Sequence, residues 1–350
     1  MESIARRRRG GGIDTARWDQ IAPHAEGASA ASTLFGHDRD GESAGQSEQT
    51  LLEARTRIRS LVSIAAKNGS SVSTQELHAL LPDGLFKDAD SVGRFVSQDE
   101  SLRQELGLEH GEVFPQAAPL LGRQRPEQRK LSAERMLQAR SFAARLDRAC
   151  PGVELLAISG STAFWGAKPD DDLDFFLVAR ANRMWVTLLA AMGAAKLERL
   201  RDPRTPTFCF NRVTESEPCL SSFARPGDTL FAREALSLKV IQGRGFFHRL
   251  LGSAAWMDRH FPTLDRRSLM ESEEAPEPVP GGGSAGWSLA NFASLFVLAP
   301  YLWLTALVRN RRLQRQGRTD ALFRTEVHLQ FFSYESRKFE ELRRDYTRAL

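Results

Sequence analysis

Two apolar runs enclose a small-residue turn and a carboxylate cluster between residues 155 and 179, and this segment constrains the fold most strongly. Gly160-Ser161 follows the first run, and the second run is preceded by Asp170, Asp171, Asp172 and Asp174. Side chains in a β-strand alternate between two faces, so Asp172 and Asp174 are expected to point to one side at the start of a strand. Neighbouring carboxylates repel each other unless a cation lies between them. The spacing therefore predicts a site for a hard cation such as Mg²⁺.

The Gly160-Ser161 pair has the features of a phosphate-binding turn. Glycine allows the backbone to approach an anion closely. The N–H groups of a tight turn that opens a helix form an anion-binding concavity. Lys168, between the turn and the aspartates, adds a cation that can hold terminal phosphates. A phosphate-binding turn beside two metal-binding carboxylates is the arrangement that phosphoryl or nucleotidyl transfer requires.

The segment resembles the signature of the DNA polymerase beta-like nucleotidyltransferase superfamily. It reads Ser159-Gly160-Ser161, ten further residues, then Asp172-Leu173-Asp174-Phe175. The resemblance implies an α+β fold with a small mixed β-sheet and flanking helices. It also implies that Gly160 and Ser161 contact a nucleoside triphosphate, such as ATP, while Asp172 and Asp174 hold two divalent metals, Mg²⁺ or Mn²⁺. The chain resembles in particular bacterial and archaeal members that carry a winged-helix-like region before this domain.

The chain departs from the superfamily pattern at the third carboxylate, which normally lies on a later strand. The next strand-like run, 208–213, carries Asn211 at its centre. An amide can coordinate through its oxygen but cannot accept a proton as a base. Glu215 and Glu217 follow, and either could replace the acid if the strand ended early. Asn211 is therefore expected to contact the nucleotide, and a catalytically weak or inactive nucleotide-binding protein is the alternative to an active enzyme.

Composition and periodicity divide the 350 residues into an expected series of segments. A capping box at Ser73 and Glu76, short helical repeats and a hairpin at 106–114 predict a winged-helix-like domain. The expected segments are a disordered tail (1–48), the winged-helix-like domain (49–118), the nucleotidyltransferase domain (128–265), a linker (266–286) and a C-terminal helical region (287–350).

A DNA-binding regulator acting through residues 51–114 is a further alternative. The expected recognition helix offers only Arg94 to DNA and is surrounded by aspartates. Such helices normally present several basic or amide side chains to base edges and phosphates. A structural or protein-contact role is therefore favoured for this segment.

Residues 287–308 form a run of twenty-two residues without a charge, followed by Arg309, Arg311, Arg312 and Arg315. Its length and basic flank fit a membrane span. Polar residues such as Asn291 and Ser294 dilute the run and suit a helix packed on the catalytic domain or lying at an interface. Both placements stay open, and membrane association through 287–308 is an expectation.

Charge and cysteine content limit the remaining function classes. The net charge is only +4 and the basic residues are dispersed, so nucleic acid is not a favoured partner. Three cysteines without metal-like spacing predict neither a disulfide framework nor a zinc site, and they suit the cytoplasm. We expect a cytoplasmic, metal-dependent nucleotidyltransferase that transfers a nucleoside monophosphate from a triphosphate to a small-molecule or protein hydroxyl, releasing pyrophosphate.

Overall fold

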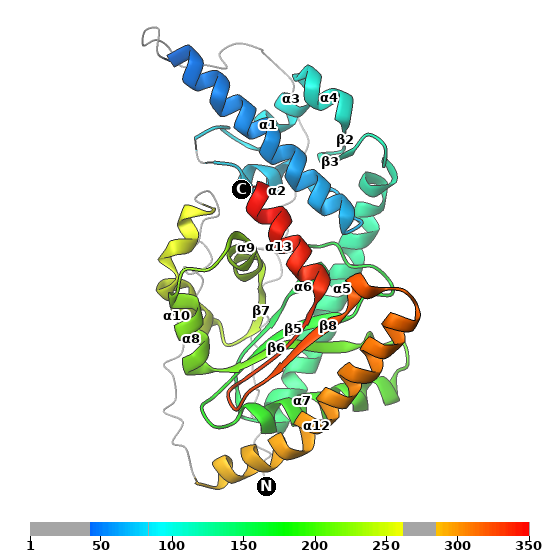
Figure 1. Ribbon diagram of the computed structural model, residues 1–350, viewed down its shortest axis with the longest axis vertical. Coiled ribbons are helices and arrows are strands. Elements are labelled where there is room, and N and C mark those ends of the chain that lie inside the picture. The colour runs from blue at the N-terminus through cyan, green and yellow to red at the C-terminus, as the bar shows by residue number, and fades with distance from the viewer. Residues whose placement is uncertain (1–42, 83, 262–284, 350) are drawn as a thin grey trace, which may run out of the picture. The chain divides into compact units, whose positions relative to one another are not determined.

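The computed structural model describes residues 43–82, 84–261 and 285–349, and this part of the chain is an α+β protein (Figure 1). The chain divides into two units, Met1–Glu48 and Gln49–Leu350. The second unit contains all the elements described below apart from the first turns of α1. Most of the expected tail and linker, residues 1–42 and 266–284, lies outside the described residues.

Residues 49–115, here called the N-terminal module, combine short helices with a three-stranded antiparallel sheet of order β1-β3-β2. The predicted capping box is confirmed, because Glu76 donates its N–H to Ser73 Oγ at 3.1 Å and Ser73 donates its N–H to Glu76 Oε2 at 2.9 Å. The predicted hairpin is also confirmed, and both of its turn residues, His110 and Gly111, have positive φ. The elements are α1 (Ser43–Lys67), β1 (Val72–Ser73), α2 (Thr74–Leu80), α3 (Ala89–Gln98), α4 (Glu100–Glu105), β2 (Leu106–Glu109) and β3 (Glu112–Pro115).

A six-stranded mixed sheet of order β7-β4-β5-β6-β9-β8 follows. Only the β5–β6 pair is parallel, and the other neighbouring pairs are antiparallel. The strands predicted around 155–158, 175–179 and 208–213 are confirmed. The strands are β4 (Val153–Ile158), β5 (Leu173–Ala179), β6 (Phe208–Glu215), β7 (Lys239–Gln242), β8 (Phe323–Val327) and β9 (Phe331–Ser336).

Helices cover both faces of the sheet, so the central strands are buried on both sides. One core contains Phe142 of α5, Phe175 of β5 and Trp185 of α7, all fully buried. The other core joins α8, α9 and α10 to the N-terminal module. The helices are α5 (Leu120–Ala149), α6 (Gly160–Ala163), α7 (Met184–Arg201), α8 (Ser216–Ala224), α9 (Thr229–Ser237), α10 (Arg244–Ser253), α12 (Ala285–Arg315) and α13 (Arg337–Ala349), with 3₁₀ turns at Ala255–Arg259 and Thr319–Ala321.

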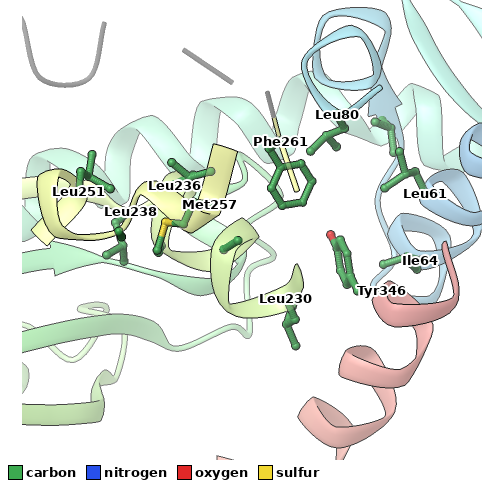
Figure 2. Packing of buried hydrophobic residues seen from close by; sticks show 14 of the residues in the cluster. Leu61, Ile64, Leu80, Leu230, Leu236, Leu238, Leu251, Met257, Phe261 and Tyr346 are labelled. Atoms are coloured by element: carbon green, nitrogen blue, oxygen red, sulfur yellow. The ribbon is translucent and has the colours of Figure 1, made fainter. Parts of the chain in front are cut away.

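The C-terminal region differs from the expected helical region 287–350, because it contributes two strands to the sheet. β9 pairs with β6, placing Phe332 opposite Val213, and β8 forms the sheet edge. The alternation of side chains along 323–327 fits a strand, but the pairing of β9 with β6, which joins this hairpin to the sheet, is a long-range contact. The final helix, α13, packs back onto the core as expected, and Figure 2 shows Tyr346 between Ile64 of α1 and Leu230 of α9.

Candidate functional site

A cavity of about 640 Å³ lies beside the turn between β4 and α6 and the start of β5. Its walls also include residues of the N-terminal module, α9 and α13. The cavity brings together all six residues proposed from the sequence, which are Gly160, Ser161, Lys168, Asp172, Asp174 and Asn211.

Gly160 lies directly against the Asp174 carboxylate. Its φ is +64°, in the left-handed region that favours glycine. A Cβ atom at this position would lie 2.5 Å from Asp174 Oδ2. The N–H of Ser159 donates to the Asp174 carbonyl at 3.0 Å, which fixes the turn to the strand. Glycine is therefore required here both by the backbone conformation and by the approach of the carboxylate.

Asp172 and Asp174 lie on the same side of the chain, as their spacing predicts. Leu173 between them is fully buried, whereas both aspartates line the cavity. The pKa of Asp174 is raised to about 7, mainly by burial and in addition by the charges of Asp172 and Asp171, while the hydrogen bond from Asn211 opposes the rise. The cavity therefore contains negative charge that the protein compensates only in part.

Asn211 occupies the position on β6 where the superfamily pattern would place a third acid. Its amide nitrogen donates to Asp174 Oδ1 at 2.6 Å, and its Oδ1 accepts from the Cys209 thiol at 3.0 Å. Asn211 thus orients Asp174 and stabilises its charged form, and it leaves Asp174 Oδ2 on the side of Gly160.

Glu215 and Glu217 lie outside the cavity, so neither replaces the third acid that the resemblance implies. β6 continues to Glu215, so the strand does not end early. Glu215 pairs with Ala179 at the far end of β5, whereas Asp174 pairs with Cys209. The Glu215 carboxylate is buried and accepts a hydrogen bond from Gln330 at 3.2 Å. Glu217 lies beyond the strand in α8, and neither glutamate lines the cavity.

Lys168 lines the cavity but is already engaged. Its Nζ donates to the Asn68 carbonyl at 2.6 Å, which ties the aspartate loop to the N-terminal module. Its N–H donates to Asp171 Oδ2 at 3.0 Å, and its carbonyl accepts from buried Arg135 at 2.6 Å. These contacts position the loop, so a phosphate contact by Lys168 would require its amine to leave Asn68.

Glu234 of α9 is a cavity residue that the sequence did not single out. Burial raises its pKa to about 7, opposed by Arg233 and reinforced by the charge of Asp174. Its local signal is a glutamate next to Arg233 in a helical stretch, Leu230–Leu236, whose other residues are apolar. That signal cannot reveal which cavity the residue faces, because the position of α9 depends on long-range packing.

Basic and aromatic side chains line other parts of the same cavity. The Arg233 guanidinium lies 4.7 Å from the centroid of the Phe164 ring, and Arg212 lies 5.5 Å from that of Phe231. Arg125 is buried and donates to Ser70, to Glu76 and to the Phe164 carbonyl. Cations and rings beside a carboxylate cluster suit a ligand with an anionic tail and a flat apolar part.

The donor set fits Mg²⁺ in a limited way. Among the described residues, no group of three or more His, Cys, Asp or Glu side chains could hold a metal ion. Mg²⁺ is commonly held by one or two carboxylates together with substrate phosphates and water. The oxygen donors of Asp172 and Asp174, and the incompletely compensated charge on Asp174, match that mode.

Comparison with known proteins finds no matching family model. It also finds no significant match among curated proteins or solved structures.

Proposed function

We propose that this cavity binds a nucleoside triphosphate with a divalent metal and that the protein is a nucleotidyltransferase of the DNA polymerase beta-like superfamily. The observation that carries the proposal is the contact between the two halves of the motif, Gly160 against the Asp174 carboxylate in one cavity. The mixed sheet and its flanking helices support the same fold assignment, and the helices and three-stranded sheet of the N-terminal module support the winged-helix-like one.

The residues have separate proposed roles. The first turn of a helix leaves N–H groups without intrahelical partners, so the α6 turn that begins at Gly160 can donate to phosphate oxygens. Asp172 and Asp174 would hold Mg²⁺ or Mn²⁺, which when bound neutralises charge on the triphosphate. Asn211 holds Asp174 in place. Arg233 and Arg212 offer charge to the anionic tail.

Glu234 is the residue best suited to accept the proton of an attacking hydroxyl. It lines the cavity with Asp174, and its pKa of about 7 lets it bind and release a proton near neutral pH. The cavity has walls from α1, α2, α9 and α13, which favours a small-molecule or protein-side-chain acceptor over a long nucleic-acid strand.

A nucleotide-binding protein with little or no catalysis is the second candidate. Asn211 in place of an acid favours it, because a neutral amide cannot act as a base. The two candidates share the metal and nucleotide site and differ only in whether pyrophosphate is released.

Pyrophosphate release from the four ribonucleoside triphosphates with Mg²⁺ or Mn²⁺ tests the proposal. Asp172→Asn and Asp174→Asn should each abolish release. Asp170→Asn is the matched control, since Asp170 is exposed, belongs to the same cluster and does not line the cavity. Turnover that survives in both cavity variants would reject this site. Metal-dependent triphosphate binding without release would support the non-catalytic candidate.

A further inference from the structure

Helix α12 buries two polar side chains of its first half and exposes most of its large apolar ones. Within its first half, Asn291 and Ser294 are buried, while Phe292 and Phe296 are 50% and 64% exposed. A helix on the surface of a water-soluble domain normally shows the opposite distribution. The exposed large apolar side chains of this helix are Leu289, Phe292, Phe296, Val297, Tyr301, Trp303, Leu304 and Val308, here called the α12 apolar face.

Helix α12 lies along α7 and reaches β8 (Figure 1). Specific contacts fix its buried side to the domain. Asn291 Oδ1 accepts from the N–H of Trp185 at 2.7 Å, satisfying the start of α7. Further along, Leu298 is buried in the core, and Asn310 exchanges two hydrogen bonds with the backbone of Phe323. The helix is therefore an integral part of the fold.

One described helix, Gly286–Arg315, is long and apolar enough to cross a membrane by length and composition. Its packing argues against a span. A spanning helix would have to leave α7, which would place Asn291 in hydrocarbon without its present partner. A helix that keeps these contacts can instead lie flat, with only its exposed side in contact with lipid.

Charge and ring chemistry select an anionic lipid surface as the occupant of the α12 apolar face. No charged residue lies between Gly286 and Val308, and Arg311, Arg312 and Arg315 follow as exposed cations. Arginines beside an apolar face complement acidic headgroups. Tyr301 and Trp303 have the amphipathic rings that concentrate at the membrane–water boundary. A large exposed apolar patch on a folded domain marks an interaction site.

We infer that the α12 apolar face inserts into the headgroup region of an anionic phospholipid bilayer, so that the protein binds the membrane surface without crossing it. The insertion places the domain at the bilayer through one side of α12 and leaves the helix packed on α7. This inference is independent of the proposed nucleotide chemistry, since none of the α12 apolar face lines the cavity.

Flotation of the full-length protein with vesicles tests the inference. Two compositions are compared, phosphatidylcholine alone and an equal mixture of phosphatidylcholine and phosphatidylglycerol. The protein should float with the mixed vesicles, bind phosphatidylcholine much more weakly, and be released as the salt concentration rises. Equal binding to both compositions, or no binding to either, would overturn the inference.

Matched variants separate the contribution of the apolar side chains to vesicle binding from that of the arginines. Phe296→Ser with Trp303→Ser should lower the partition coefficient on mixed vesicles by roughly 100-fold, because two large apolar side chains no longer insert. Leu137→Ser on α5 is the control, since Leu137 is 64% exposed and apolar but distant in sequence from α12. Replacing Arg311, Arg312 and Arg315 with glutamine should lower the partition coefficient on mixed vesicles by roughly 100-fold. Arg140→Gln, at an exposed position on α5, should leave the partition coefficient unchanged.

Other occupants would give distinct results. If the double variant abolishes self-association measured by light scattering while the wild type fails to bind vesicles, a second copy covers the face and the lipid inference is wrong. If bound protein resists both high salt and alkaline carbonate, α12 spans the bilayer and the surface-binding inference is wrong. Release by either treatment, with loss of binding in both sets of variants, supports surface binding.

Discussion

Asn211 donates a hydrogen bond to Asp174 Oδ1 at 2.6 Å across the parallel strands β5 and β6. A neutral amide thus occupies the position of an expected third carboxylate and stabilises the charge of its neighbour. An acid at the same place would repel Asp174 in the absence of metal and would add a ligand in its presence. In the proposed metal site, this pair would set how strongly ligand binding depends on a cation.

Substitution of Asn211 tests that relationship. Asn211→Asp should tighten Mn²⁺ binding about 10-fold, because a further carboxylate oxygen becomes available, while Asn211→Ala should weaken it about 10-fold, because Asp174 loses its orienting partner. Calorimetric titration of each purified variant with Mn²⁺ measures both effects. Equal weakening in the two variants would show that Asn211 acts through packing alone.

Gly160→Ala should destabilise the protein and disrupt the site. The left-handed backbone costs a non-glycine residue about 1–2 kcal/mol, and the added Cβ would lie 2.5 Å from Asp174 Oδ2. A lower melting temperature and loss of metal binding are expected. Gly193→Ala is the matched control, since Gly193 is exposed within α7 and a Cβ there meets no atom within 4 Å. It should stabilise the fold by about 0.5–1 kcal/mol. Equal effects of the two substitutions would contradict the steric account.

Asp174 should make metal-free stability depend on pH. Its pKa is raised from 3.8 to about 7, so the folded chain keeps a proton that the unfolded chain has released between those values. The free energy of unfolding contributed by this group therefore falls as pH rises from about 4 to 7. Asp174→Asn should be more stable than the wild type at pH 8 and similar to it near pH 4, as urea denaturation can measure.

Excess Mg²⁺ should reverse this difference, since it stabilises the wild type by binding the folded state and has no such effect on Asp174→Asn. A variant that is less stable than the wild type at pH 8 without metal would argue against a repulsive carboxylate cluster.

Glu234→Gln should lower kcat by about 100-fold or more, with little effect on KM, if Glu234 accepts the hydroxyl proton. The wild-type rate should rise with pH through about 7, since the carboxylate must be free of its proton. This rise should be absent from the variant. Glu127→Gln, at an exposed position on α5, should retain the wild-type profile. A pH profile unchanged in Glu234→Gln would remove Glu234 from the proton transfer.

The sequence predicted the local features of the site because they depend on neighbouring residues. The Asp172 and Asp174 pair follows from strand alternation, and the capping box at Ser73 and Glu76 requires only a three-residue spacing. Glu234 and the C-terminal strands depend on distant contacts. β9 pairs with β6 across more than a hundred residues, and nothing in the local pattern of 331–336 specifies Val213 as the partner of Phe332.

The length and composition of 287–308 left two placements of the helix open for a similar reason. Asn291 and Ser294 could have marked a packed side or only diluted a span. The contact between Asn291 and the start of α7 favours the packed placement over the span. This contact depends on an element more than a hundred residues away.

Calorimetric titration with a non-hydrolysable nucleoside triphosphate analogue, with and without Mn²⁺, tests the metal–triphosphate site most directly, because it requires no turnover. The wild type and Asp170→Asn should bind the analogue only when Mn²⁺ is present, and Asp172→Asn and Asp174→Asn should lose that binding. Metal-dependent binding of equal strength in all four proteins, or in none, would contradict the account.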